Sequence, residues 1–591
     1  MSAPSAHVHG AVRDFRTFLA DDWAAWLAEY PEFATQVGAP GHDDRWTDDS
    51  RAGIERRRRH LAESLERVRG IDRDQLEPAD RLSYDLYREN LELTEAGLPF
   101  GDDPFPMPGV VPHNLWMPIN QMEGIHITAS ETLELQPRAR VAEYAAIFAR
   151  MEALPAAVDQ QLALLKDGLS RGFSPPQVAV RGLPAQVAAL TPADPAESPL
   201  LVPFREFAGT IPEADRARLA ERGRSIYVER LVPAFGRLHE YLVRDYLPRC
   251  RPTVGATALP SGAAGYDHHV RWQTTTDLTA RQIHEIGLAE VARIRGEIEA
   301  IARTTGFRGT LAEFNERLRT DPAHRFARAE DLVDGYRVIA KTTDPALTRL
   351  FGRLPRLPYG VLPVPDFRAP SSPAAYYQPG APSIGRPGYF YANTYDLSAR
   401  PRWEMQALAL HESVPGHHLQ LAIGQETEGL PEFRRFAGYG AFVEGWGLYA
   451  ESLGEELGHY RDPYSKYGQL TFDMWRAVRL VVDTGMHALG WTRDRAIAFF
   501  RENTGKSDLD IGVEVDRYIV WPGQALGYKV GQLKFRELRT YAEQHLGDRF
   551  DVRKFHDVVL EESALPLDLL ERRVHAWVEA VASGPAPVRA S

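Results

Sequence analysis

Cysteine and long apolar runs are almost missing from this sequence of 591 residues. Its one cysteine, Cys250, excludes an intramolecular disulfide and gives no indication of an oxidising compartment. There is no run of about 18 apolar residues that could cross a membrane, and the opening MSAPSAHVHGAVRDF lacks the apolar core of a signal peptide. We therefore expect a soluble cytoplasmic protein with no membrane partner, while its oligomeric state stays open.

An excess of basic charge is missing as well. Lysine and arginine number 69 against 81 aspartate and glutamate residues, which gives a net charge of −12. The basic residues are interspersed with acidic ones, so we do not expect nucleic acid as a partner. The rest of the composition, 44% hydrophobic and 25% charged, is typical of a globular chain that can bury a large core.

Imidazole and carboxylate groups are concentrated in the stretch LALHESVPGHHLQ. It contains His411, Glu412, His417 and His418, directly after an apolar run that favours a helix. This density predicts a metal site. The usual helical zinc motif, H-E-x-x-H, places two histidines one turn apart and uses the glutamate as general base. Here Pro415 occupies the fifth position, so the second histidine must come later.

The spacing leaves two candidates for the second histidine ligand. On a straight helix His417 would lie about 240° from His411, and His418 would share its face but lie about 10 Å further along. Pro415 removes a backbone donor and Gly416 accepts irregular dihedrals, so the helix can kink here. We predict that a kink brings His417 to the metal and leaves His418 against the wall of the site. In the alternative, the helix breaks and restarts, and His418 reaches the metal.

A third ligand is expected from the segment GAFVEGWGLYAESLG, which contains two acids seven residues apart and so on one helical face. Glu444 is flanked by Phe442, Val443 and Trp446, where an unpaired carboxylate would be costly to bury. It is therefore the better ligand candidate. Glu451 is expected to support the ligands or to form an ion pair.

Four segments carry a resemblance to a known family: HESVPGHHLQ, FVEGWGLYAESLG, MWRAVRLVVDTGMH and WPGQALGYKVGQLK. Together they resemble the large bacterial family catalogued as domain of unknown function 885, over most of the chain. More remotely, His-Glu followed by a distal Phe-Val-Glu is similar to gluzincin metallopeptidases of the thimet oligopeptidase, angiotensin-converting enzyme and Taq carboxypeptidase type. The resemblance implies a mainly α, two-lobed fold with one zinc ion per chain at the floor of a deep central channel.

The resemblance also implies a small β-element beside the zinc helix. Residues 359–364, 375–377 and 389–394 are predicted as short strands within a segment rich in proline, glycine and tyrosine. In gluzincins the edge of such an element pairs with an extended substrate, which is a natural use of a free strand edge. A purely structural hairpin is the alternative.

A tyrosine near glycines in VDRYIVWPGQALGYKVGQLK resembles the gluzincin tyrosine that faces the zinc. On that basis Tyr528 is our candidate donor to a developing oxyanion. Arg517, nearby in sequence, is a candidate for binding substrate or supporting the site.

One face of the helix predicted over residues 472–489 is polar. Arg476, Arg479, Asp483 and His487 share this face, while the other side chains are largely apolar, so we expect the helix to be buried. The four polar residues either pair with one another or line a cavity. In the second case an arginine would bind a substrate carboxylate bidentately.

Helical periodicity covers most of the first 250 residues, and after Cys250 the sequence becomes richer in glycine and in small and β-branched residues. We interpret residues 1–250 as an N-terminal helical lobe and residues 251–591 as a zinc-binding catalytic lobe. Because no linker separates them, the two lobes are expected to form one continuous fold.

The segment after Cys250 is predicted to begin irregularly. Residues 254–276 mix glycine with small and β-branched residues, and His268 and His269 are expected in a loop there. A long helix over residues 278–305 should follow, with Thr279 as its cap.

These residues predict a zinc-dependent hydrolase that cleaves a peptide or amide bond in a short peptide or peptide-like substrate. The zinc ligands would be His411, His417 and Glu444. Glu412 would act as general base toward the attacking water, and Tyr528 would stabilise the oxyanion. A metal-dependent dehydratase, lyase or amidohydrolase acting on a small metabolite is the alternative. A structural zinc site in a binding protein ranks last, because the cysteines of a closed four-ligand site are absent.

Overall fold

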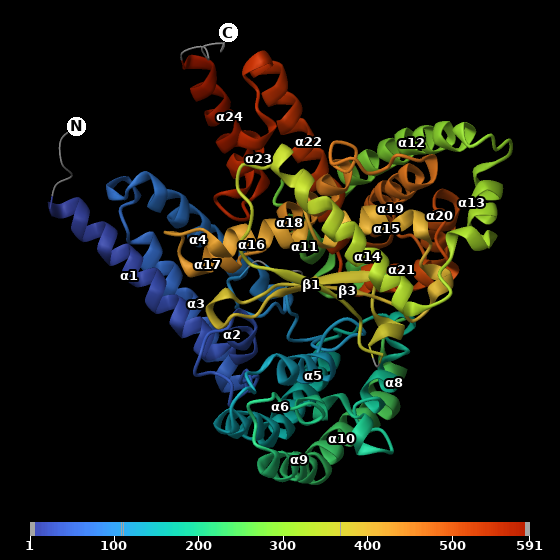
Figure 1. The fold of residues 1–591 in the computed structure, drawn as a ribbon. Coiled ribbons are helices and arrows are strands. Elements are labelled where there is room, and N and C mark those ends of the chain that lie inside the picture. The colour runs from blue at the N-terminus through green and yellow to red at the C-terminus, as the bar shows by residue number, and fades with distance from the viewer. Residues whose placement is uncertain (1–5, 108, 110–111, 367, 585–591) are drawn as a thin grey trace.

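The chain is mostly helical, with one small sheet (Figure 1). A computed structural model of the protein describes residues 6–107, 109, 112–366 and 368–584. The helices before the sheet are α1 (Ala6–Glu29), α2 (Pro31–Val37), α3 (Arg51–Arg69), α4 (Pro78–Gly97), α5 (Ile125–Leu135), α6 (Tyr144–Ser170), α7 (Gln177–Val180), α8 (Leu183–Ala188), α9 (Glu213–Ile226), α10 (Val232–Tyr241), α11 (Gly262–Thr274), α12 (Ala280–Thr304), α13 (Leu311–Thr320) and α14 (Ala329–Thr343). Those after it are α15 (Met405–Glu412), α16 (His417–Glu426), α17 (Glu432–Phe436), α18 (Gly440–Ser452), α19 (Pro463–Ala488), α20 (Arg493–Asn503), α21 (Asp508–Val520), α22 (Gly527–Leu546), α23 (Val552–Leu560) and α24 (Leu567–Ser583).

The apolar side chains form two large cores that do not follow a division at residue 250. The main core joins α1, α3 and α4 to the helices that follow residue 250. The second core consists of Trp46 and residues between 119 and 250, on α5, α6 and α8 to α10. In Figure 1 these helices gather at one end of the molecule, with the sheet near its centre. No helix in the described part of the chain is long and apolar enough to cross a membrane.

Three short strands form the sheet: β1 (Tyr359–Pro363), β2 (Ala375–Gln378) and β3 (Gly388–Ala392). The order is β1-β3-β2, with β1 parallel and β2 antiparallel to β3. The three predicted strands are thus confirmed to within two residues at each end. β2 is an edge strand that contacts α15, the first of the two helices with candidate histidine ligands.

Two local predictions around α11 and α12 had different outcomes. Helix α12 is confirmed, and the side chain of Thr279 caps it by accepting a hydrogen bond from the backbone of Gln282. The prediction of an irregular segment over residues 254–276 is wrong, because α11 occupies half of this range and carries both His268 and His269. A buried face that includes Tyr266 stabilises this helix through tertiary packing, which outweighs the weak helical propensity of its glycines.

Helix α19 runs through the main core and is buried along most of its length, as predicted. An ion pair at its first half connects three helices. Lys529 of α22 is completely buried and donates to Asp473 of α19, which also accepts from Arg293 of α12 at 3.1 Å. Burial raises the pKa of Asp473, but Lys529 and Arg293 outweigh it and lower that pKa to about 2.

We expect Lys529→Met to lower the free energy of unfolding by about 3 kcal/mol, because it leaves the buried carboxylate of Asp473 with one cation fewer. Urea denaturation measures this change. Lys341→Met is the control, since Lys341 also pairs with an aspartate, Asp344, but has a side chain that is 85% exposed. Equal losses in the two variants would contradict the importance of the buried pair.

Candidate metal centre

The two helices with candidate histidine ligands are separate elements. α15 ends at Glu412 and α16 begins at His417, with a cis peptide bond before Pro415 in the link. The predicted kink is therefore wrong, and the helix instead breaks and restarts. Gly416 permits the tight return, since a Cβ there would lie 1.9 Å from the carbonyl oxygen of His411. The rings of His411 and His417 consequently lie 4.6 Å apart.

One face of α18 holds the ring of His411. Glu444, Gly447 and Glu451 share this face at helical spacing. Nδ1–H of His411 donates to Glu451 Oε1 at 2.9 Å, and its Nε2 lies 3.6 Å from Glu444 Oε2. Gly447 leaves room for the ring, because a Cβ at this position would lie 2.7 Å from the imidazole Cε1. The helix thus fixes both the position and the orientation of His411.

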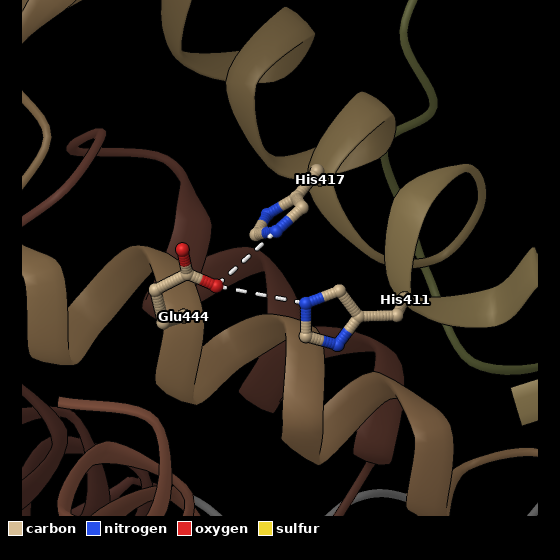
Figure 2. Close-up of side chains that lie close together, drawn as sticks. All are labelled: His411, His417 and Glu444. Carbon is tan, nitrogen blue, oxygen red and sulfur yellow. Dashed lines mark ion pairs between the residues drawn. The ribbon is translucent and has the colours of Figure 1, made fainter. Parts of the chain in front are cut away.

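Three possible ligand atoms converge on one point in Figure 2. Glu444 Oε2 lies 3.6 Å from His411 Nε2 and 3.4 Å from His417 Nε2, and all three atoms lie within 4.8 Å of one another. These separations are long for hydrogen bonds but close to the roughly 3.3 Å between neighbouring ligand atoms of a tetrahedral zinc ion. Glu444 Oε2 is buried without a hydrogen bond from any described residue. The donor set and its spacing therefore fit zinc.

Glu451 determines which nitrogen of His411 is available to a metal. An ionised carboxylate only accepts hydrogen bonds, so Nδ1 carries a proton and Nε2 is the nitrogen that can give its lone pair to a metal. Burial lowers the pKa of His411, but Glu444 and Glu451 outweigh it and raise that pKa to about 9. Burial raises the pKa of Glu444, yet His411 and His417 hold it well below its ordinary value. The site thus favours a positive charge at the point of convergence.

The predicted general base and oxyanion donor border the same cavity as the three ligand residues. Glu412 is 7% exposed, and its carboxylate forms no hydrogen bond with the described residues. The ring of Tyr528 stacks on that of His411, with centroids 6.3 Å apart. Its hydroxyl oxygen accepts from Arg517 Nη2 at 3.1 Å. Sequence reasoning therefore identified side chains that the fold does bring together.

Arg476 and Arg479 line the cavity, as one of the two alternatives for the polar stripe of α19 predicted, but they pair with glutamates of other helices and not with other residues of the stripe. Arg476 pairs with Glu451 at 3.3 Å, and Arg479 donates to Glu514 at 2.8 Å. Glu514 also pairs with Arg517 at 3.6 Å, so three guanidinium groups on the cavity wall share two carboxylates. Arg476 Nε and Arg479 Nη1 are buried without hydrogen-bond partners in the described chain. The guanidinium groups of Arg476 and Arg479 on this wall thus each keep an N–H donor that no described residue accepts.

His418 lies apart from the triad. Its Nδ1 is 2.8 Å from the hydroxyl of Tyr377 on β2, and its ring centroid is 4.3 Å from that of Tyr359 on β1. Burial lowers its pKa to about 4, so the ring is neutral near neutral pH. His418 therefore anchors α16 to the sheet, and the alternative in which it reaches the metal is not the observed geometry.

His487, predicted to bind substrate or support the site, lies in the core. Its Nδ1 accepts from the backbone N–H of Ala256, and its Nε2 donates to the carbonyl of Tyr518. Both nitrogens are therefore engaged, and the residue does not border the cavity. Asp483 likewise bonds to the hydroxyl of Tyr266 outside the site. The helical stripe predicted a shared face of α19 but not what the end of that face would contact.

The cavity beside the triad has a volume of about 390 Å³. Its walls come from α5 and α8 of the second core, from β2, and from α19, α21 and α22. His126, Gln121 and Gln186 border it and were missed by sequence reasoning, because nothing in their local sequence indicates a site. Gly447 was missed although its position between Glu444 and Glu451 was a usable signal.

Comparisons with known proteins identify relatives without a described activity. The profile of a bacterial family of proteins of unknown function, DUF885, matches residues 31–574. The structure is similar to that of "the putative lipoprotein from Colwellia psychrerythraea", with a TM-score of 0.89 and 27% identity over 96% of this chain and 99% of the other. A "putative lipoprotein of unknown function from Shewanella oneidensis" shares the fold at a TM-score of 0.69 and 18% identity, over 94% and 99% of the two chains. A comparison with curated proteins found no match.

We predict that His417→Ala loses most of the bound zinc, because the variant lacks one of three ligands, whereas His418→Ala retains about one equivalent per chain. Elemental analysis after dialysis against a weak chelator measures both values. Loss of zinc from the His418 variant alone would mean that the observed triad is not the binding site.

Gly447→Ala should weaken zinc binding by about 10- to 100-fold, because the added methyl group displaces the ring of His411 from between its two glutamates. Competition titration with a zinc-binding dye measures the affinity. Gly236→Ala on α10 is the matched control, since a Cβ there meets no atom within 4 Å. Equal affinities in the two variants would contradict the role given to Gly447.

Proposed function

This chain belongs to the DUF885 family, and from that premise we propose that it is a zinc-dependent hydrolase that cleaves a peptide or amide bond in a short peptide or peptide-like substrate. The observation that carries the proposal is the convergence of His411, His417 and Glu444 at a cavity that Glu412 also borders. Two histidines with one carboxylate are the donor set of catalytic zinc sites, whereas structural sites commonly use cysteine.

Glu412 is the proposed general base. Zinc held by the triad would polarise a substrate carbonyl and lower the pKa of a water molecule. Glu412 would accept a proton from the attacking water and return it to the leaving nitrogen. Its position supports this role, because it follows the ligand His411 directly and its carboxylate is not engaged by another described residue.

Tyr528 is the proposed donor to the oxyanion. Arg517 donates to the phenolic oxygen, so the tyrosine's own proton is free to point into the cavity. Arg517 is itself held by Gln524 at 2.9 Å. A donor fixed in this way needs little rearrangement when charge develops on the substrate carbonyl, which is the requirement for stabilising a transition state electrostatically.

The arginine wall is the proposed site for a carboxylate of the substrate. This wall carries the guanidinium groups of Arg476, Arg479 and Arg517. Fewer carboxylates than guanidinium groups pair with them. A guanidinium group matches a carboxylate bidentately, and the unpartnered N–H groups of Arg476 and Arg479 would gain partners. A peptide with a free carboxyl end or an acidic side chain satisfies this requirement.

The free edge of β2 is the proposed site for the backbone of an extended substrate. The backbone carbonyl of Ala374 accepts a hydrogen bond from the N–H of Asn393, the residue after β3. Hydrogen-bonded and non-hydrogen-bonded pairs alternate along an antiparallel pair of strands, so the polar backbone groups of Ala375 and Tyr377 point away from β3. Both residues border the cavity. Unpaired edge groups next to a hydrolytic site are suited to strand addition by a peptide.

We extend the proposal to the finer description of the fold and to the location of the protein. The helical composition and the small sheet beside α15 support a two-lobed, gluzincin-like architecture in which the cavity is the floor of a channel. The two structural relatives carry the description "putative lipoprotein", which favours export, whereas the sequence favours the cytoplasm. Fractionation of the source bacterium, followed by immunodetection, distinguishes the two locations.

We predict that Glu412→Gln retains zinc but loses about 100-fold or more in turnover, because the amide cannot accept the proton. Products from a mixed peptide library, identified by mass spectrometry, measure turnover, and cleavage with gain of one water distinguishes hydrolysis from dehydratase or lyase chemistry. Glu428→Gln, at an exposed position after α16, is the control. Near-normal turnover in the Glu412 variant would contradict the hydrolytic mechanism.

A further inference from the structure

A group of unpartnered polar atoms lies on the part of the cavity wall that the second core supplies. His126 of α5 is 3% exposed, and neither of its ring nitrogens has a hydrogen-bond partner among the described residues. The side-chain oxygens of Gln121 and Gln186 are buried and also lack partners there. All three residues border the cavity of the triad. Buried polar groups are normally satisfied, so this group indicates a place where a ligand binds.

Backbone contacts fix the orientation of both glutamine side chains. Nε2 of Gln121 donates to the carbonyl of Asp516 at 2.8 Å, and Nε2 of Gln186 donates to the backbone carbonyl of Gln121 at 3.2 Å. A carbonyl oxygen only accepts, so the nitrogen of each amide must face it and each side-chain oxygen is left over. Asp516 precedes Arg517, which ties this group to the helix that carries part of the arginine wall.

The leftover atoms define the chemistry of a matching ligand. Burial lowers the pKa of His126 to about 4 against the opposing effect of the neighbouring Gln186 side chain, so its ring is neutral and offers one N–H donor and one acceptor. With the two glutamine oxygens, the group presents three acceptors and one donor. A carboxylate would bring no donor for the three acceptors. An ammonium group would leave the histidine N–H unmatched. Glu131 on the same helix would not balance the charge of an ammonium group, because it is already paired with Arg368 at 2.5 Å.

We propose that His126, Gln121 and Gln186 form a subsite for a carboxamide group, so that the enzyme selects peptides with asparagine or glutamine at one position. A carboxamide is neutral and brings one carbonyl acceptor for the histidine N–H and two N–H donors for two of the three acceptors, so it engages both kinds of atom, which neither a carboxylate nor an ammonium group does. Sites that hydrogen-bond a polar group reject an apolar analogue strongly, because their own buried groups would then stay unpaired. The subsite deepens the proposed function and rests on it for the identity of the substrate as a peptide.

The test uses synthetic tetrapeptides in matched pairs that carry asparagine or leucine at each position in turn, since these two side chains have the same number and branching of heavy atoms. With the zinc-loaded protein we expect one position at which asparagine is preferred by about tenfold or more in kcat/KM. In His126→Phe and in Gln186→Met the preference should fall to about twofold or less, while the leucine peptide is cleaved at least as well as before. Ile127→Leu, which alters an apolar neighbour on the same wall, should keep the preference.

Binding separates a failure of the subsite from a failure of the hydrolase proposal. Calorimetric titration of the Glu412→Gln protein with the same peptide pairs should show the same preference for asparagine. Binding with this preference but without cleavage by the wild type would support the subsite and contradict the hydrolase. No tenfold difference at any position, or a preference that survives in both variants, would overturn the subsite whether or not peptides are cleaved. Thermal melting establishes that each variant is folded, and Gln186→Met alone suffices if His126→Phe is not.

Discussion

The imidazole of His411 lies across helix α18 between the carboxylates of Glu444 and Glu451, and the surrounding helices are arranged around this contact. α15 can approach α18 only at a glycine, because any side chain at position 447 would enter the ring. Behind α18, Gly445 contacts α22 so closely that a Cβ there would lie 2.5 Å from the Cα of Gly531. Arg476 extends the constraint to α19 through its ion pair with Glu451. The packing of α15, α18, α19 and α22 is thus linked to the position of this histidine.

Along α19, charges in the core are fully paired, whereas charges at the cavity are not. At one end, Asp473 is matched by cations from two other helices, and at the other end His487 has both nitrogens bonded to the backbone. Between them, Arg476 and Arg479 are paired but keep N–H groups without partners in the described chain. Burying a charge without full compensation is costly, and a fold that serves only stability would have little reason to retain it. The incomplete pairing therefore marks the functional part of an otherwise uniform buried helix.

Sequence reasoning identified residues whose chemistry conflicts with an apolar setting. His411, His417 and Glu444 could be named because their spacing and their neighbours suggest a shared partner, and the strands and the capped helix α12 follow from local rules. Reasoning failed where a role depends on contacts between distant segments. His487 shares a helical face with the site arginines yet meets backbone atoms of other elements. His126 lies in an ordinary amphipathic helix, and only the approach of two glutamines from other segments gives it significance.

The two cores supply different parts of the cavity. The triad and its supporting glutamate lie on helices of the main core, while α5 and α8 of the second core form another part of the cavity wall. Substitutions on α5 and α8 can therefore reshape this part of the cavity without disturbing the geometry of His411, His417 and Glu444. Natural selection can act on the two properties separately. Under the proposed function, relatives that share the triad would keep one reaction and differ in the substrates that the wall from the second core admits.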